Sequence, residues 1–218
     1  MLAFLLPSER PRMTARDTAR PVRKRGRPTV SERVERPAQI LEGALPVFLE
    51  HGYGNATVDQ LATAARVTKR TIYSYFDGKA GVFTAMVRSL ATTVSSDAPD
   101  GDTLESLATR IVYRLNSAEL IGLHRLVIAE STRFPELAKT LHDNGDARHI
   151  ARLADHIRAE LGQDAALRAQ PLFTLLLGEE HRKRLLGLLA PATAAEAAAH
   201  ADRALALLGL STEGPRSR

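Results

Sequence analysis

The stretch from residue 57 to residue 79 constrains the fold of this 218-residue chain more than any other. It reads TVDQLATAARVTKRTIYSYFDGK and predicts two short helices joined by a tight turn. Thr57 and Gln60 have the spacing of a capping box, which satisfies free backbone amides at a helix start, and apolar residues follow at helical intervals. Thr68 is a suitable N-cap for a second helix. A turn around Arg66 therefore separates two predicted amphipathic helices.

The second of these helices has two contrasting faces. Val67, Ile72 and Phe76 can turn inward. The residues expected outside are basic, hydroxylated or aromatic: Lys69, Arg70, Thr71, Tyr73 and Tyr75. Phosphates require cations and hydroxyl donors, and base edges require side chains that reach into the major groove. This composition favours the recognition helix of a helix-turn-helix, and the alternative is a plain helical hairpin with solvated charges.

The stretch resembles the DNA-binding motif of TetR-family transcriptional regulators. The residues that carry the resemblance are Ala65, Val67, Thr68, Thr71, Ile72, Tyr73, Tyr75, Phe76 and Lys79. It implies a DNA-binding set made of Thr57, Thr68, Lys69, Arg70, Thr71, Tyr73, Tyr75 and Lys79. Lys79 would meet a phosphate at the start of the following helix, helped by the helix dipole. The family usually has glycine where this chain has Arg66. Either the turn keeps a positive φ there, at a cost of roughly 1 kcal/mol, or its geometry differs slightly. The Arg66 side chain would be a phosphate contact or a tolerated substitution.

The positive charge of the chain is concentrated near its N-terminal end. Residues 1–36 hold ten Lys or Arg against four acidic residues, whereas the whole chain has a formal charge of +5. We expect residues 1–32 to form a disordered basic arm. Its Arg-Gly-Arg-Pro segment resembles an AT-hook, in which Arg25 and Arg27 would enter an A·T-rich minor groove. A basic tail that touches phosphates without sequence preference is the alternative.

Helical periodicity extends over the rest of the chain, without a convincing strand. The expected fold class is therefore all-α, with a three-helix N-terminal helix-turn-helix head joined by a linking helix to a C-terminal helical bundle. The DNA-binding domain would span residues 33–94, and a domain for ligand binding and dimerisation residues 95–218. We expect a first helix that ends at Gly52, a linking helix over about residues 79–93, an Asp102–Glu105 capping box, and a last helix capped by Thr193.

The segment from Leu123 to Gly145 resembles the ligand-binding half of one TetR subgroup, the AefR-like or efflux-associated regulators. Polar groups among apolar helices orient small ligands, and the candidates for binding a small-molecule effector are His124, Glu130, Phe134 and His142. Partly exposed interface positions are an equally open alternative for these four residues.

The resemblance also implies a homodimer formed through the last two helices. The last helix has small and apolar residues that permit close helix approach, namely Ala198, Ala201, Ala204, Leu205 and Leu208. Two heads one DNA turn apart, ~34–36 Å, would read the two halves of a palindrome.

The sequence disfavours several other classes of function. Because the chain has no cysteine, disulfides and thiolate metal sites are excluded. No apolar run is long enough to span a bilayer, and the first residues, MLAFLLP, lack the basic start and the cleavage site of a secretory signal. We therefore expect a cytoplasmic location and no membrane partner.

Neither a catalytic residue nor a cofactor is expected, since the sequence has no phosphate loop and no nucleophile elbow. His142, His149 and His156 would share one side of an ideal helix, which could suggest a metal site. However, the chain lacks the Glu-x-x-His pair of di-iron bundles, and Asn144-Gly145 is expected to interrupt the helix. Ordinary surface or core-edge histidines are therefore favoured over a metal site.

Together these observations predict a ligand-responsive transcription regulator. It would act as a repressor, bind a palindromic double-stranded operator as a dimer, and be released by a small-molecule effector. One alternative is a sequence-tolerant architectural DNA-binding protein that is driven by the basic arm. Another is a helical-bundle enzyme or metal protein.

Overall fold

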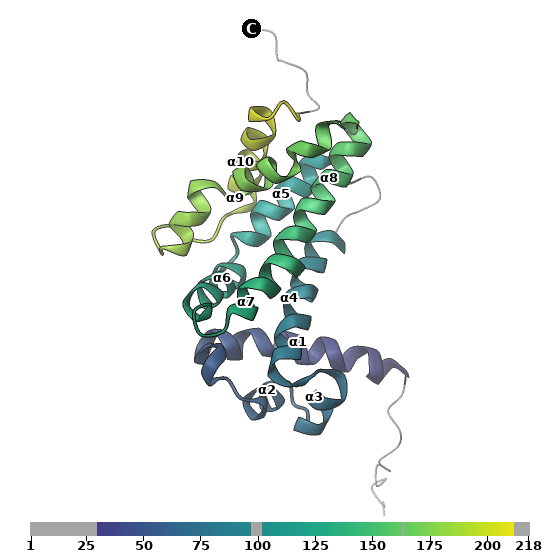
Figure 1. Cartoon of the computed structure of the whole chain (residues 1–218), viewed down its shortest axis with the longest axis vertical. Coiled ribbons are helices and arrows are strands. Elements are labelled where there is room, and N and C mark those ends of the chain that lie inside the picture. The colour runs from purple at the N-terminus through teal and green to yellow at the C-terminus, as the bar shows by residue number, and fades with distance from the viewer. Residues whose placement is uncertain (1–29, 97–101, 163, 212–218) are drawn as a thin grey trace, which may run out of the picture.

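The computed structural model describes residues 30–96, 102–162 and 164–211. Helices are the only regular secondary structure in these ranges, which confirms the predicted all-α fold (Figure 1). The elements are α1 (Val30–Asn55), α2 (Val58–Ala64), α3 (Lys69–Tyr75), α4 (Gly78–Ser96), α5 (Leu104–Leu115), α6 (Ala118–Glu130), α7 (Pro135–Leu141), η1 (His142–Asp146), α8 (Ala147–Leu161), η2 (Asp164–Arg168), α9 (Ala169–Leu185) and α10 (Ala194–Leu207). We call α1–α3 the head and α5–α10 the body.

The start of α1 lies three residues before the predicted start at residue 33. Only the last three positions of the predicted basic arm fall in this helix. The two arginines expected in the minor groove, Arg25 and Arg27, lie outside the described residues.

The head is assembled on α1, which packs against α2, α4 and α6. Its buried face includes Ile40 and Phe48. The helix breaks at Gly52, where φ is 75°, so the predicted end of the regular helix is confirmed and one more turn follows. Gly43 allows α2 to come close, because a Cβ at this position would lie 3.2 Å from the backbone nitrogen of Ala65.

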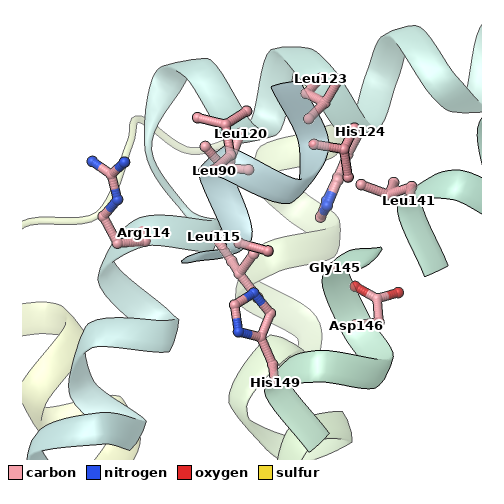
Figure 2. A pocket seen from close by; sticks show the side chains of 12 residues that line it. Leu90, Arg114, Leu115, Leu120, Leu123, His124, Leu141, Gly145, Asp146 and His149 are labelled. Carbon is pink, nitrogen blue, oxygen red and sulfur yellow. The ribbon is translucent and has the colours of Figure 1, made fainter. Parts of the chain in front are cut away.

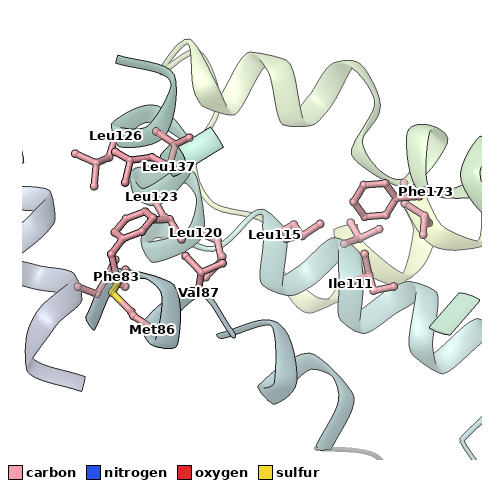
Figure 3. Close-up of a cluster of buried hydrophobic side chains, with 14 of the residues drawn as sticks. Phe83, Met86, Val87, Ile111, Leu115, Leu120, Leu123, Leu126, Leu137 and Phe173 are labelled. Carbon is pink, nitrogen blue, oxygen red and sulfur yellow. The ribbon is translucent and has the colours of Figure 1, made fainter. Parts of the chain in front are cut away.

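The helix α4 joins the head to the body, as predicted. It packs against α1 and α3 in the head and against α5, α7 and η1 in the body. Figure 1 shows it rising from the head into the body. Figure 3 shows its buried side chains beside those of α6 and α7: Phe83, Met86, Val87, Leu123, Leu126 and Leu137. One hydrophobic core therefore continues from the head into the body.

The helix α5 lies at the centre of the body. Its residues predicted to share one face are all buried, namely Leu104, Leu107, Ile111 and Leu115. The helix α10 begins with the predicted capping box of Thr193 and Glu196, and it packs along α5.

The face of α10 that was expected to approach a second subunit is used within this one. Ala201, Ala204 and Leu205 are buried, because small side chains let α10 lie close to α5. The buried part of the small-residue pattern therefore packs inside the subunit, and the homodimer through the last two helices stays a prediction.

Two predicted local features differ from the structure. The capping box expected at Asp102 begins one residue later, where Thr103 and Ser106 bind each other's backbone amides. Asp102 instead accepts a hydrogen bond at 2.7 Å from the guanidinium group of Arg110, two turns along α5. The break expected at residues 144–145 is a π-helical turn, so the chain stays helical from α7 through η1 into α8.

Candidate nucleic-acid interface and internal cavity

The turn between α2 and α3 is a Schellman motif centred on Arg66. The amide of Val67 donates to the carbonyl of Ala62 at 2.9 Å, and the amide of Arg66 donates to the carbonyl of Thr63 at 3.1 Å. This motif requires a left-handed residue at its centre, and Arg66 adopts that conformation with φ of 53°. The helix-turn-helix geometry is therefore kept without the usual glycine, at a cost of roughly 1 kcal/mol.

Threonine hydroxyl groups begin both short helices of the motif. Thr57 and Gln60 form the predicted capping box at the start of α2. At the start of α3, Thr68 Oγ1 accepts a hydrogen bond from the amide of Thr71 at 3.1 Å, and the two hydroxyl oxygens are 2.8 Å apart. Both predicted N-caps are confirmed, and the hydroxyls of Thr68 and Thr71 are held side by side.

The outward face of α3 carries basic and aromatic side chains. Ile72 is fully buried and anchors the helix, whereas Tyr73 is 61% exposed and Tyr75 is 36% exposed. Lys69 and Arg70 are also exposed. Figure 1 shows α3 at the end of the molecule remote from α9 and α10. A long rigid surface can therefore approach this face without meeting the body.

One of these cations is already paired. Lys69 Nζ lies 2.7 Å from a carboxylate oxygen of Asp59 in α2, and both side chains are more than half exposed. Exposed ion pairs contribute little to stability. A phosphate group can therefore compete with Asp59 for this ammonium group.

Lys79 is bonded within the head. Its Nζ donates to the carbonyl oxygens of Tyr53 and Gly54 at 2.6 and 3.1 Å and lies 4.6 Å from the centroid of the Tyr53 ring. The ammonium group thereby caps the carbonyl end of α1. Burial lowers the pKa of Lys79, the Glu130 carboxylate opposes this shift, and Arg133 adds to it. The sequence did not predict this bracing role, in which Lys79 holds the end of α1. The phosphate contact of Lys79 stays a prediction.

Glu130 and Phe134, two of the predicted effector contacts, lie where the body meets the head. The Glu130 carboxylate accepts a hydrogen bond from the amide of Gly54 at 3.0 Å. The ring of Phe134 meets the ring of Tyr53 edge-on, with centroids 5.0 Å apart, and the Arg133 guanidinium carbon lies 5.1 Å from the Phe134 centroid. These side chains fasten α6 and the start of α7 to the end of α1.

An internal cavity lies among α4, α5, α6, α7, η1 and α8 (Figure 2). Its volume is about 20 Å³, which is room for one water molecule. Most of its wall is aliphatic. The side chains at the wall that can form hydrogen bonds or carry charge are Arg114, His124, Asp146 and His149.

Two buried histidines enter this cavity, His124 from α6 and His149 from α8 (Figure 2). Nδ1 of His124 lies 3.1 Å from Nε2 of His181, and Nδ1 of His181 lies 3.1 Å from Oδ1 of Asn116. Burial lowers the pKa of His124, His149 and His181 to about 4 each. All three imidazoles are therefore neutral near pH 7.

The four predicted effector residues do not converge on one site. Only His124 reaches the cavity, since Glu130 and Phe134 lie at the junction with the head. The side chain of His142 is 65% exposed and borders a surface groove between η1, α8 and α9.

Asp146 and His149 line the cavity but were missed as cavity residues in the sequence. Burial raises the pKa of Asp146, and His142, whose Nδ1 is 3.9 Å away, opposes this shift. The π-helical turn changes the helical register, so an ideal helix extended from His142 misplaces the residues after it. Accordingly, His142 is exposed while His149 is buried. Within the three described ranges, no three His, Asp or Glu side chains form a group that could hold a metal ion.

A helix-turn-helix with an outward basic and aromatic second helix, joined through one core to a helical body, defines a class of DNA-binding transcription regulators. None of the helices in the described part of the chain is long and apolar enough to cross a bilayer.

Comparison with known proteins specifies the family. The model of the tetR family of bacterial regulatory proteins matches residues 40–86, and that of the AefR-like transcriptional repressor C-terminal domain matches residues 102–208. The HTH-type transcriptional repressor SCO4008 of Streptomyces coelicolor is 28% identical over 123 residues, or 56% of this chain and 62% of that protein. The uncharacterized HTH-type transcriptional regulator YdeS of Bacillus subtilis is 31% identical over 149 residues, or 68% of this chain and 67% of that protein.

Solved structures of the same family share the fold. A putative TetR-family regulator from Mesorhizobium loti has a TM-score of 0.63 at 26% identity, over 83% of this chain and 97% of that one. A TetR regulator from Agrobacterium tumefaciens has a TM-score of 0.62 at 25% identity, over 79% and 93%. The chain belongs to the TetR family, with an AefR-like C-terminal domain. Because the family and these relatives are transcription regulators, the chain is a regulator and not an enzyme.

Proposed function

We propose that this protein is a homodimeric transcriptional repressor that binds a palindromic operator and is released by a small-molecule effector. The observation that carries the proposal is the position of α3. Its exposed face carries Lys69, Arg70 and Tyr73 at one end of the molecule, while the core behind it continues through α4 to an internal cavity.

Within the proposed complex, α3 lies in the major groove. Lys69 and Thr71 contact base edges, while Tyr73 and Lys79 contact phosphates. The remaining contacts come from residues at the helix starts and on the same face, namely Thr57, Thr68, Arg70 and Tyr75. Arg25 and Arg27 of the basic arm extend the interface into the minor groove. Phosphate contacts fix the register of the protein, and base contacts supply the sequence preference.

The proposed dimer forms through α9, α10 and the segment that joins them. Large apolar side chains are exposed in the segment that joins the two helices, namely Leu186, Leu188 and Leu189, and Leu207 is exposed at the far end of α10. Clusters of exposed apolar residues commonly mark protein interfaces, which supports this choice. Pairing places two heads on one face of the DNA, so that each reads one half-site of a palindrome.

Release follows from the shared helix α4. Val87 and Leu90 of α4 line the cavity, and α4 also packs against α1 and α3. An effector that binds better at one separation of the two heads shifts the population toward that separation, by no more than its differential affinity for the two states. Because the proposed mechanism requires access to DNA, the proposed location of the protein is the cytoplasm.

Selection of bound sites from a randomised duplex pool tests the proposal. We expect the intact protein to enrich a palindrome whose half-sites lie about one DNA turn apart. Lys69→Ala should change which bases are preferred, whereas Tyr73→Ala should weaken binding across all sequences.

Removal of residues 1–29 separates this proposal from the architectural alternative. We expect the shortened protein to bind more weakly but to keep the same preferred site, because the arm adds mostly phosphate contacts. If the intact protein has no preferred site and the shortened one has no affinity, the arm-driven architectural protein replaces the proposed repressor.

A further inference from the structure

The side chains of Asn116, His181 and His124 form a hydrogen-bonded row that ends in the internal cavity. This row determines which hydrogen-bonding atom faces a ligand in the cavity. This row of hydrogen bonds starts at Asn116, a buried residue at the end of α5. Nδ2 of Asn116 donates to the carbonyl oxygen of Val112 at 2.8 Å. Since a carbonyl only accepts, this contact fixes which end of the amide is nitrogen. The atom 3.1 Å from Nδ1 of His181 is therefore Oδ1, an acceptor.

The orientation of Asn116 determines the protonation of the two histidines. Because Oδ1 of Asn116 accepts, the proton of neutral His181 is on Nδ1 and its Nε2 is bare. Nδ1 of His124, 3.1 Å from that bare nitrogen, must donate to it. His124 is therefore also protonated on Nδ1, and its Nε2 carries an unprotonated lone pair. Burial lowers the pKa of both residues to about 4, which keeps both neutral at pH 7.

The unprotonated Nε2 of His124 is available to accept a hydrogen bond from a ligand. The His124 side chain is only 8% exposed and lines the cavity (Figure 2). Among the described residues no donor bonds its Nε2. This atom is not sealed in the protein either, unlike Nε of Arg114, which is enclosed without a partner. A buried acceptor thus points to a donor that the ligand supplies.

A second imidazole, that of His149, also lines the cavity. His149 stacks on Phe173 with ring centroids 6.2 Å apart, and no hydrogen bond to its nitrogens occurs among the described residues. A neutral imidazole has one N–H donor and one acceptor. His149 therefore adds a second neutral hydrogen-bonding group to the cavity wall.

We propose that the cavity takes an uncharged, largely apolar molecule that donates a hydrogen bond to Nε2 of His124, from a hydroxyl or an N–H group. Aliphatic side chains make up the rest of the wall and suit an apolar body. A carboxylate has no proton to donate and would lose its hydration close to Asp146. An ammonium group would lose its hydration in a cavity that has room for only about one water molecule.

This inference rests on the proposed function, since it takes the cavity as the effector site. The cavity of about 20 Å³ must widen to admit an aromatic ring. Because α4 forms part of the wall, widening displaces the helix that carries the head. The same displacement of α4 then accompanies ligand binding at His124 and release from DNA.

Four probes of similar size test the ligand class: phenol, toluene, benzoate and benzylammonium. We expect phenol to bind to the full-length protein about fivefold to tenfold more tightly than toluene, because one net hydrogen bond is worth that factor. Benzoate and benzylammonium should bind more weakly than phenol. Preference for either ion, equal binding of phenol and toluene, or no binding by any probe would overturn the proposal.

Nitrogen NMR of histidine-labelled protein tests the acceptor directly and needs no ligand. At pH 7 we expect the proton of His124 on Nδ1, with Nε2 unprotonated and shifted by phenol. The variant His124→Gln assigns the signals, and His51→Gln in the head is the matched control. A proton on Nε2 in the wild-type protein contradicts the proposal even if the variant fails to fold.

The two experiments distinguish this inference from the proposed function. A protein that selects a palindromic operator but carries a protonated Nε2 at His124 contradicts only the ligand class. A protein with the expected His124 that selects no operator contradicts the proposed repressor instead.

Discussion

The carboxylate of Glu130, the last residue of α6, accepts a hydrogen bond from the backbone amide of Gly54, in the last turn of α1, across 3.0 Å. The same turn is held from α4, because Lys79 donates to the carbonyl oxygens of Tyr53 and Gly54. The body and the linking helix thus both form hydrogen bonds to the backbone of the last turn of α1, next to the helix-turn-helix. A displacement of α6 or α4 is therefore passed directly to the head.

Removing the carboxylate should loosen this junction. We expect Glu130→Ala to lower the free energy of unfolding by about 1–2 kcal/mol, because the partly buried Gly54 amide loses its partner. Glu130→Gln keeps an acceptor oxygen and should lose less. Urea unfolding of the three proteins measures the difference. If Glu130→Ala unfolds like the wild type, the contact does not hold the head to the body.

Lys79 has a structural role that can be measured without DNA. We expect Lys79→Met to lower the free energy of unfolding of the unbound protein by about 1–3 kcal/mol, since hydrogen bonds to a charged donor are lost. The predicted phosphate contact is a separate property. If it exists, the slope of log affinity against log salt concentration falls in magnitude by about 1 in the variant. An unchanged slope would leave Lys79 with the bracing role alone.

Arg66 stores strain at the centre of the motif, because its φ is 53°. We expect Arg66→Gly to raise the free energy of unfolding by up to about 1 kcal/mol, while Arg66→Ala, which keeps a Cβ, stays near the wild type. Thermal unfolding measures the effect. The alanine variant also separates strain from charge, because a phosphate contact by Arg66 would be lost equally in both variants. A glycine variant less stable than the alanine variant would contradict the strain argument.

The head could be predicted from the sequence because its determinants are local. The capping threonines, the turn at Arg66 and the buried Ile72 all lie within one stretch of 23 residues, and each follows from hydrogen-bond or steric rules for neighbouring residues. The positive φ of Arg66 was one of two expected geometries, and the structure has it. The same reasoning located the end of the first helix at Gly52. It could not show that Lys79 binds the end of α1, since that contact joins residues 26 positions apart.

The sequence predicted the helices of the body, but it did not predict how these helices pack. Helical spacing showed that α10 has a small-residue face, yet not whether α5 or a second subunit covers it. The cavity depends on pairs such as His124 and His181, which are 57 positions apart. The π-helical turn at residues 142–146 also breaks the register on which the expected histidine face depended. Glu130 and Phe134 were predicted as effector contacts or as partly exposed interface positions, and their partners Gly54 and Tyr53 lie in the head.

The buried histidines give the stability of the protein a pH dependence of known sign. Burial lowers the pKa of His124, His149 and His181 from 6.5 to about 4, so the unfolded chain binds more protons between these values. Their contribution is complete above pH 6.5 and is lost as the pH falls toward 4, by at most about 3 kcal/mol for each imidazole. Asp146, whose pKa burial raises, acts in the opposite sense and cannot cause this loss.

Urea unfolding at pH 7.5 and pH 5.0 measures this dependence. We expect the wild-type protein to be less stable at pH 5.0 by a few kcal/mol, since the three sites are coupled and their separate effects do not simply add. His149→Phe keeps a ring beside Phe173 but removes one titrating group, so it should reduce the difference between the two pH values by roughly 1–2 kcal/mol. The same difference in His149→Phe as in the wild type would mean that His149 is not held neutral in the folded protein.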